Sequence, residues 1–165
     1  MNQKHRRIVI ILFCAFFFIT STCSILLYTT LRFVVVKGES MENTIQDGDK
    51  FLVNRLAYKW KKPAYNDIVI LDVDKIKGHE LYIKRVVGLP GDVIEIRGRD
   101  FYRNGQHVKE PYVKELMRPD HFKIVVPKKH VFVMGDNRNH SIDSRIFHSI
   151  NYETEVKSVI VYSLN

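Results

Sequence analysis

An uninterrupted apolar run near the N-terminus limits what this chain can fold into. Residues 8–31 carry no charged side chain over 24 consecutive positions. As an α-helix with a rise of ~1.5 Å per residue, this run is roughly 36 Å long, enough to cross a ~30 Å hydrocarbon core with some tilt. The sequence therefore predicts one transmembrane helix over residues 8–31, with a separate folded domain after it.

Basic side chains predict the direction in which this helix crosses the membrane. The denser group of basic residues lies before the run, together with the α-amino group, and consists of Lys4, Arg6 and Arg7. Only Arg32 and Lys37 follow closely on the other side. Because the more basic flank stays in the cytoplasm, we expect residues 1–7 there and residues 32–165 outside, as one extracytoplasmic domain.

Two other interpretations of the run are less favoured. A cleaved secretory signal peptide has an apolar region of 7–15 residues and a small-x-small exit, whereas this run is longer and has no such exit before Arg32. Lipid attachment at Cys23 is disfavoured because no Leu stands three positions ahead of it. The only other cysteine is Cys14, so the exported part has no disulfide and no cysteine metal site.

The net charge of +8 is consistent with a domain that lies against an anionic membrane surface. The chain has 26 Lys and Arg against 18 Asp and Glu, and three of the basic residues precede the apolar run. Basic residues near the headgroups favour membrane lipid as a partner. A nucleic-acid partner would require the domain to be in the cytoplasm, so the predicted topology argues against it.

After Leu31 the pattern is that of β-structure. Short apolar or alternating segments recur, separated by turn residues, at 32–38, 50–58, 67–73, 80–92, 93–98, 99–108, 121–137 and 156–164. The segment 99–108 has Asn104-Gly105 in hairpin position, and 121–137 contains two strands around Pro127. The fold class is therefore mainly β, with one helical turn expected around residues 41–46.

Several common catalytic motifs are absent from the sequence. It has seven histidines but no H-E-x-x-H or similar metal spacing, no phosphate-binding loop and no G-x-S-x-G elbow. No cofactor and no metal are expected.

Three segments carry residues capable of chemistry. Ser40 lies in "GESME" just past the apolar run, and Lys84 lies in "LYIKRVVG", with Tyr82 and Val86 on the same face of the expected strand. The third segment is "GDNRNHSIDSR", residues 135–145. Taken singly, they also fit a turn serine, a snorkelling or edge lysine, and a polar surface loop.

Chemistry connects the serine to the lysine. A serine hydroxyl is a poor nucleophile until a base takes its proton. A lysine can be that base when burial disfavours its charged form and lowers its pKa. The sequence spacing of Ser40 and Lys84 does not establish a contact, so at this point a Ser–Lys pair is one possibility.

Together the segments "GESMENT", "YIKRVVGLPGD" and "GDNRNHSIDSR", in this order behind an apolar span, resemble the signature boxes of bacterial type I signal peptidases in their short, single-anchor form. The resemblance covers most of the chain. It implies a mostly antiparallel β catalytic core with a small β insertion, at about residues 97–127. It also implies an enzyme of the bacterial cell membrane that removes signal peptides from exported preproteins, after small-x-small sequences at the outer face.

The resemblance also implies roles for individual residues. Ser40 is the acylating nucleophile, and its backbone N–H is a donor to the oxyanion hole. Lys84 is the general base, deprotonated at rest, and the Ser141 hydroxyl orients its amine.

Supporting roles follow for a second set of residues. Asp143 and Arg145 form a paired brace of the third segment, and Asp136 and Arg138 are further structural supports. Met41 lies near the membrane-facing surface and the substrate groove.

Three positions depart from the family pattern. Asn43 replaces a frequent Pro, which we expect to loosen the turn after Ser40. Gly38 stands where some relatives have a hydroxyl that completes the oxyanion hole. His148 stands where Gly is usual, so the backbone there is expected to differ.

Two functions from other classes compete with this interpretation. A membrane-tethered β module that binds exported chains without cleaving them predicts no effect of Ser40→Ala. A self-cleaving repressor-type protease uses the same Ser–Lys pair but is a soluble cytoplasmic protein with a DNA-binding head, which the predicted membrane span disfavours.

Overall fold

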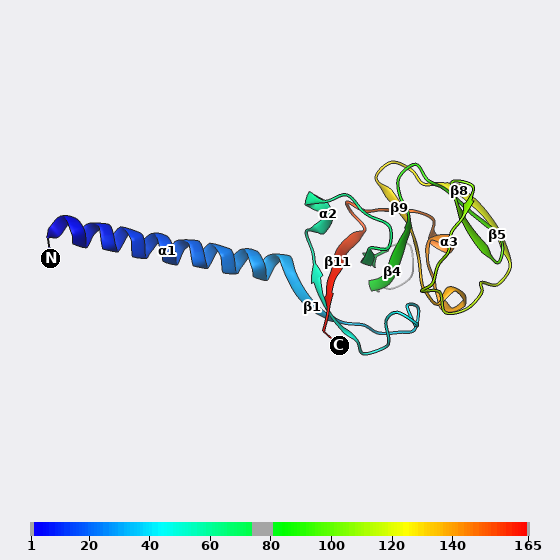
Figure 1. The fold of residues 1–165 in the computed structure, drawn as a ribbon, viewed down its shortest axis with the longest axis horizontal. Helices are drawn as coiled ribbons and strands as arrows, with labels where there is room; N and C mark the ends of the chain where they lie inside the picture. Colours follow the sequence, from blue (N-terminus) through cyan, green and yellow to red (C-terminus); the bar gives the residue numbers. More distant parts are fainter. Residues whose placement is uncertain (1, 74–80, 165) are drawn as a thin grey trace.

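The computed structural model describes residues 2–73 and 81–164. Helix α1 (Gln3–Thr30) extends away from a β domain formed by the rest of the chain (Figure 1). All of its described side chains are unburied, and its length and composition are those of a membrane-crossing helix. The hydroxyls of Thr20, Thr22 and Thr29 donate to backbone carbonyls three or four residues earlier, which satisfies these polar groups within the apolar helix.

The helix passes into the first strand without a linker. Leu31 ends α1 as its C-cap and begins β1 (Leu31–Val35). The backbone N–H of Arg55 donates to the Thr30 carbonyl at 2.8 Å, so the loop after β2 (Lys50–Asn54) is tied to the helix end. The start of the β domain is therefore held close to the end of the anchor.

The larger sheet has seven strands in the order β1-β2-β11-β3-β4-β9-β10, and every neighbouring pair is antiparallel. Besides β1 and β2, its strands are β3 (Ile68–Asp72), β4 (Leu81–Gly88), β9 (His130–Met134), β10 (Ile150–Asn151) and β11 (Val156–Ser163). The predicted segment 80–92 begins at Glu80, which lies outside the described residues.

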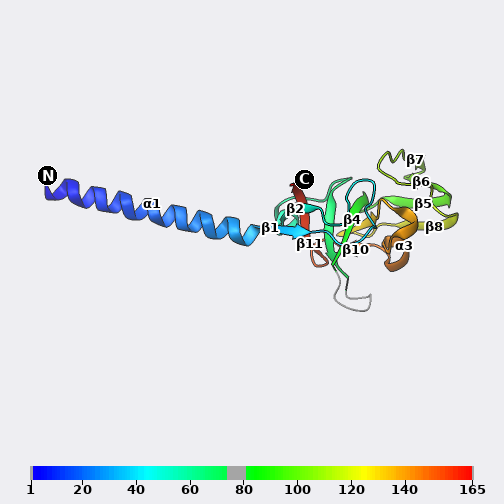
Figure 2. The same cartoon turned by 90° about the horizontal axis from the view of Figure 1, so that it is seen from below.

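A smaller antiparallel sheet lies at the end of the molecule far from α1, as both views show (Figures 1 and 2). Its order is β7 (Gln106–His107), β6 (Asp100–Arg103), β5 (Val93–Gly98) and β8 (Asp120–Val125). Asn104 and Gly105 join β6 to β7 with φ of 53° and 77°, the left-handed pair that a tight hairpin turn requires. The two antiparallel sheets behind one apolar helix confirm the predicted fold class.

Short helices were not predicted from the sequence. The strand expected over 50–58 ends at Asn54, and α2 (Ala57–Trp60) follows it. A second short helix, α3 (Ser144–Phe147), follows the short 3-10 turn at Arg138–His140. Such elements are too brief to show a helical period in sequence. The turn expected near residue 41 is present, since the Ile45 N–H donates to the Met41 carbonyl at 2.9 Å.

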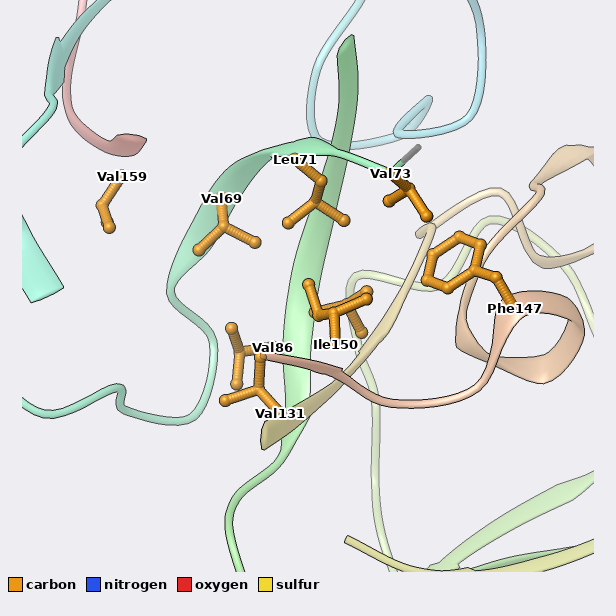
Figure 3. Packing of buried hydrophobic residues seen from close by; sticks show 9 residues of the cluster. Val69, Leu71, Val73, Val86, Val131, Phe147, Ile150 and Val159 are labelled. Atoms are coloured by element: carbon orange, nitrogen blue, oxygen red, sulfur yellow. The ribbon is translucent and has the colours of Figure 1, made fainter. Parts of the chain in front are cut away.

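Buried apolar residues form three clusters. Figure 3 shows one of them, in which Val69 and Leu71 of β3 and Val86 of β4 lie among side chains of β9, β11 and α3. A second cluster joins the smaller sheet to Phe132 and Met134 of β9. The third cluster packs the segment after β1 against β2, β3 and β4. These contacts fix the loop that follows β1 relative to β4.

Candidate active site

Ser40 and Lys84 meet in the folded chain, although 44 positions separate them in sequence. Ser40 lies in the turn after β1, and Lys84 lies in β4, paired with Val69 of β3. The Lys84 Nζ is 2.8 Å from the Ser40 Oγ. The contact that the sequence spacing could not establish is thus a direct hydrogen bond in the structure. These two residues are called the dyad below.

The Lys84 side chain is almost completely buried, with 1% of its surface exposed. Burial lowers the pKa of this amine from its usual 10.5 to about 8; the Asp143 carboxylate opposes the shift, Arg145 adds to it, and Asp136 opposes it. The lowered pKa favours the neutral form of the amine, and the expectation of an amine deprotonated at rest stays a prediction.

The loop of residues 135–145 lies against the backbone of Ser40. The Asn137 N–H donates to the Ser40 carbonyl at 3.1 Å, and its Nδ2 donates to the Glu39 carbonyl at 3.1 Å. A Cβ on Gly135 would lie 2.5 Å from the Ser40 carbonyl oxygen and 2.3 Å from the Ser141 Oγ. Only a glycine permits this close approach of the loop to the nucleophile.

The Asp143 carboxylate organises the loop. It accepts two hydrogen bonds of 2.8 Å from the Arg145 guanidinium and one of 3.1 Å from the Gly135 N–H. It also caps α3 through the Arg145 N–H. Arg145 in turn donates to the Arg138 carbonyl at 2.6 Å. Asp143 and Arg145 are thus in contact, as the resemblance implies, and their importance for activity stays a prediction.

Asp136 and Arg138 are buried and pair with residues outside the loop. Asp136 accepts two hydrogen bonds of 2.6 and 2.8 Å from Arg85 of β4. Arg138 donates two, of 2.6 and 2.8 Å, to Glu110. The sequence interpretation missed Arg85 and Glu110. The available signal was Arg85 itself, a second charged residue next to Lys84 in an otherwise apolar strand.

Ser141 makes no hydrogen bond to the lysine amine in this structure. Lys84 Nζ donates to Ser40 Oγ and to the Ile83 carbonyl, at 2.8 and 2.9 Å. The Ser141 Oγ is buried and has no hydrogen-bond partner within the described part of the chain. The expected orienting bond is therefore absent here, although the ammonium has a third donor to offer.

Met41 is a core residue. Its side chain is 1% exposed and belongs to the cluster with Val36, Ile45 and Phe51. Its expected place near the membrane-facing surface and the substrate groove stays a prediction. The apolar side chain directly after Ser40 anchors the Ser40 turn in the core.

Asn43 and His148, two of the three positions that depart from the family pattern, both have a left-handed backbone conformation. Asn43 has φ of 89°, which a proline with its fixed φ near −65° does not adopt. The turn therefore has a different conformation and is not merely loosened; the Asn43 side chain donates to the Tyr112 carbonyl. His148 has φ of 67° and ψ of −170°. The backbone there keeps a conformation suited to glycine, contrary to expectation.

Gly38 also has left-handed backbone, with φ of 95°, and its N–H donates to Asp47 at 2.8 Å. The Ser40 N–H donates no hydrogen bond to any described residue of the chain. It is therefore available as an oxyanion donor.

An apolar cavity of about 350 Å³ lies between the segment at the end of β1 and the start of β4. It is lined by the residues that precede each dyad member, 34–37 and 81–83, together with Ile70. Over Leu81–Lys84, strand β4 pairs with β3, whereas β9 pairs only with Arg85 and the residues beyond it. Strand β1 lies at the edge of its sheet. Among the described residues, no strand pairs with the outer edge of β1, and β9 does not pair with β4 before Arg85.

Comparisons with known proteins identify relatives that match most of the chain. The family model described as "Signal peptidase, peptidase S26" matches residues 6–161. The chain is 35% identical over 164 residues to signal peptidase I V of Bacillus subtilis strain 168, covering 88% of this chain and 95% of that protein. It is 38% identical over 121 residues to signal peptidase I P of Bacillus subtilis subsp. natto, covering 67% of this chain and 64% of that protein.

A solved structure is also similar. The crystal structure of a signal peptidase I from Enterococcus faecalis V583 matches with a TM-score of 0.53 and 29% identity, over 61% of this chain and 98% of that one. Together with the N-terminal apolar helix, these similarities make this a membrane-anchored protein. The chain belongs to the peptidase S26 family of signal peptidases, the serine endopeptidases named signal peptidase I.

Proposed function

We propose that this protein cleaves signal peptides from exported preproteins with Ser40 as nucleophile and Lys84 as general base. The observation that carries the proposal is the 2.8 Å contact between the Ser40 Oγ and an amine that is 1% exposed. A buried amine with a lowered pKa can act as a base, and the serine hydroxyl within hydrogen-bond distance is the group that gives it a proton.

The reaction follows from this geometry. Neutral Lys84 takes the Ser40 proton while the Oγ attacks the scissile carbonyl carbon, and the Ser40 N–H stabilises the oxyanion that forms. Lys84 then gives the proton to the leaving amine, which leaves an ester on Ser40. A water molecule, deprotonated by Lys84, hydrolyses the ester and restores the serine.

Ser141 and the carboxylate–arginine pairs have supporting roles in this proposal. The Ser141 hydroxyl is buried without a partner, so it is free to accept from the third N–H of the lysine amine when that group turns during the reaction. Asp143 with Arg145, and Asp136 and Arg138 with their partners, hold the loop against the Ser40 backbone.

The substrate is an extended segment that lies between β1 and β4. In an extended chain, residues i and i+2 point to the same side, so a small-x-small sequence directs both small side chains toward the apolar cavity and the middle one away. The backbone of β1, at the edge of its sheet, and of β4 next to Lys84 would supply hydrogen-bond partners. We place the N-terminus in the cytoplasm and the site at the outer membrane face, from the cluster of basic residues before α1.

The test uses the purified full-length protein in lipid vesicles with a preprotein that has a small-x-small site, and reads the cleavage site by mass. Wild type is expected to cut, whereas Ser40→Ala and Lys84→Ala are expected to lose the activity with the fold intact. Lys123→Ala, at an exposed position of the smaller sheet, is the matched control and should keep the wild-type rate. A near-normal rate in the Lys84 variant would exclude the lysine base.

The orientation has its own test. Protease added outside intact cells is expected to remove a C-terminal tag and to leave an N-terminal tag untouched. The reverse pattern would exclude the proposed topology.

A further inference from the structure

Asn137 holds the two peptide groups on either side of the nucleophile. Its backbone N–H donates to the Ser40 carbonyl, and its side-chain Nδ2 donates to the Glu39 carbonyl, each at 3.1 Å. Its side chain is 1% exposed, so water does not compete for these bonds. No sequence motif assigned a role to this residue.

The bond to Glu39 fixes a second group. The Glu39 carbonyl and the Ser40 N–H belong to one planar trans peptide, in which C=O and N–H point in opposite directions. A donor that fixes the carbonyl therefore also fixes the direction of the N–H. The Ser40 N–H donates to no described residue and is available for an oxyanion.

We propose that the Asn137 side chain is a positioning residue for the oxyanion hole, because its hydrogen bond to Glu39 sets the direction of the Ser40 N–H. The inference rests on the proposed function, since it assigns a task within that reaction. The Glu39 carbonyl also accepts the Glu42 N–H at 3.0 Å, so the turn itself supplies part of the restraint. Loss of the side chain is therefore expected to misdirect the N–H and not to remove it.

The rest of the Asn137 amide supports a positioning role. Its Oδ1 is buried and has no hydrogen-bond partner among the described residues. A buried acceptor without a partner lowers stability, so the amide is not explained by its contribution to the folded state alone. Both hydrogen bonds that Asn137 donates end on the Ser40 segment and neither ends on Lys84. The side chain therefore acts on the N–H and not on the base.

The test compares the full-length wild type with Asn137→Leu, which keeps the side-chain size, and with Asn137→Ala. Asn139→Leu is the matched control. Asn139 lies in the same loop as Asn137, but its side-chain amide forms hydrogen bonds with the backbone of Leu116 and Arg118 and not with the Ser40 segment. Each protein is assayed for kcat, KM and the pH dependence of kcat/KM. Each is also titrated with a peptide aldehyde, whose adduct with Ser40 places an oxygen at the N–H, and with the corresponding peptide amide.

In the Asn137 variants we expect kcat to fall about 10- to 100-fold, below the loss for a deleted oxyanion donor, with KM unchanged. Aldehyde binding should weaken in step with kcat, whereas amide binding and the pH midpoint should stay as in wild type. If Asn137→Leu does not fold, the Ala variant gives the result.

Other results overturn the inference. Unchanged kcat in a folded variant excludes it and leaves the proposed function standing. A shifted pH midpoint, or equal weakening of aldehyde and amide, would mean that Asn137 acts through Lys84 or on the groove as a whole. Failure of the wild type to cleave, or cleavage by Ser40→Ala at the wild-type rate, overturns the proposed function and this inference with it.

Discussion

Arg85 and Asp136 form a buried ion pair with hydrogen bonds of 2.6 and 2.8 Å, across 51 positions of sequence. Arg85 directly follows Lys84 in β4, and Asp136 directly precedes Asn137 in the loop. The pair therefore joins the strand that contains Lys84 to the loop that contacts the Ser40 backbone. The Arg85 guanidinium also lies 4.0 Å from the centre of the Tyr112 ring.

Breaking this ion pair is expected to destabilise the fold strongly. Asp136→Leu or Arg85→Met alone leaves one buried charge unpaired, which costs roughly 3–5 kcal/mol. The double variant removes both charges and should regain much of that loss. Urea denaturation of the detergent-solubilised proteins measures the effect; a double variant as unstable as the sum of the single ones would contradict it.

Cleavage is expected to depend on the protonation of Lys84. Burial lowers the pKa of its amine to about 8, and only the neutral form accepts the Ser40 proton. kcat/KM should therefore rise about tenfold per pH unit below that value and level off above it. The measurement is kcat/KM from pH 6 to 10 with one preprotein. A flat profile across this range would rule out the lysine base.

His148→Gly is expected to stabilise the protein. The φ of 67° and ψ of −170° at this position fall in a region that only glycine adopts without strain, and the strain is on the order of 1–3 kcal/mol. Part of the gain is offset by the greater freedom of glycine in the unfolded chain. A net gain of about 1 kcal/mol is expected in the free energy of unfolding.

The matched control for this change is His148→Ala. It removes the exposed ring but keeps the Cβ that causes the strain, so it should give no gain. Equal stabilisation by Ala and Gly would show that the ring, and not the backbone, is responsible.

Trp60 is expected to report contact of the β domain with lipid. It is the only tryptophan in the chain, is 87% exposed on α2, and has Lys59, Lys61 and Lys62 as neighbours. Tryptophan and lysine together favour an anionic membrane interface, and α2 follows the loop bonded to Thr30. In anionic vesicles its emission should shift to the blue and be quenched by lipids brominated near the headgroup.

Replacing the three lysines by Gln should reduce this quenching in anionic vesicles and leave it unchanged in zwitterionic ones. An emission spectrum in vesicles equal to that of tryptophan in water would place α2 away from the bilayer.

The sequence predicted those features that repeat at short range. Alternating residues identified the strands, and Asn104-Gly105 identified the hairpin, because both signals occupy neighbouring positions. The Ser40–Lys84 contact required knowledge of related sequences, since nothing local to either residue reveals the other. The partners of Asp136 and Arg138 were missed for the same reason, as Arg85 and Glu110 lie 51 and 28 positions away.

Other features were hidden because they depend on backbone geometry. The hydrogen bonds of Asn137 end on backbone carbonyls of a segment far away in sequence, and the left-handed conformations of Asn43 and His148 are tolerated by these residue types but not specified by them. The burial of Met41 was not predicted, because the sequence around Ser40 does not show its packing against Val36, Ile45 and Phe51.

Because α1 passes directly into β1, the anchor also fixes a distance. Thr30 ends the helix, Leu31 begins the strand, and Ser40 follows nine residues later. Because no linker absorbs a change in length, the distance from Ser40 to the end of the anchor is set by the number of residues between them. For the proposed cleavage at the outer face, a preprotein anchored by its own apolar segment would be cut at a fixed distance from the membrane, so that bilayer thickness would contribute to the specificity of the enzyme.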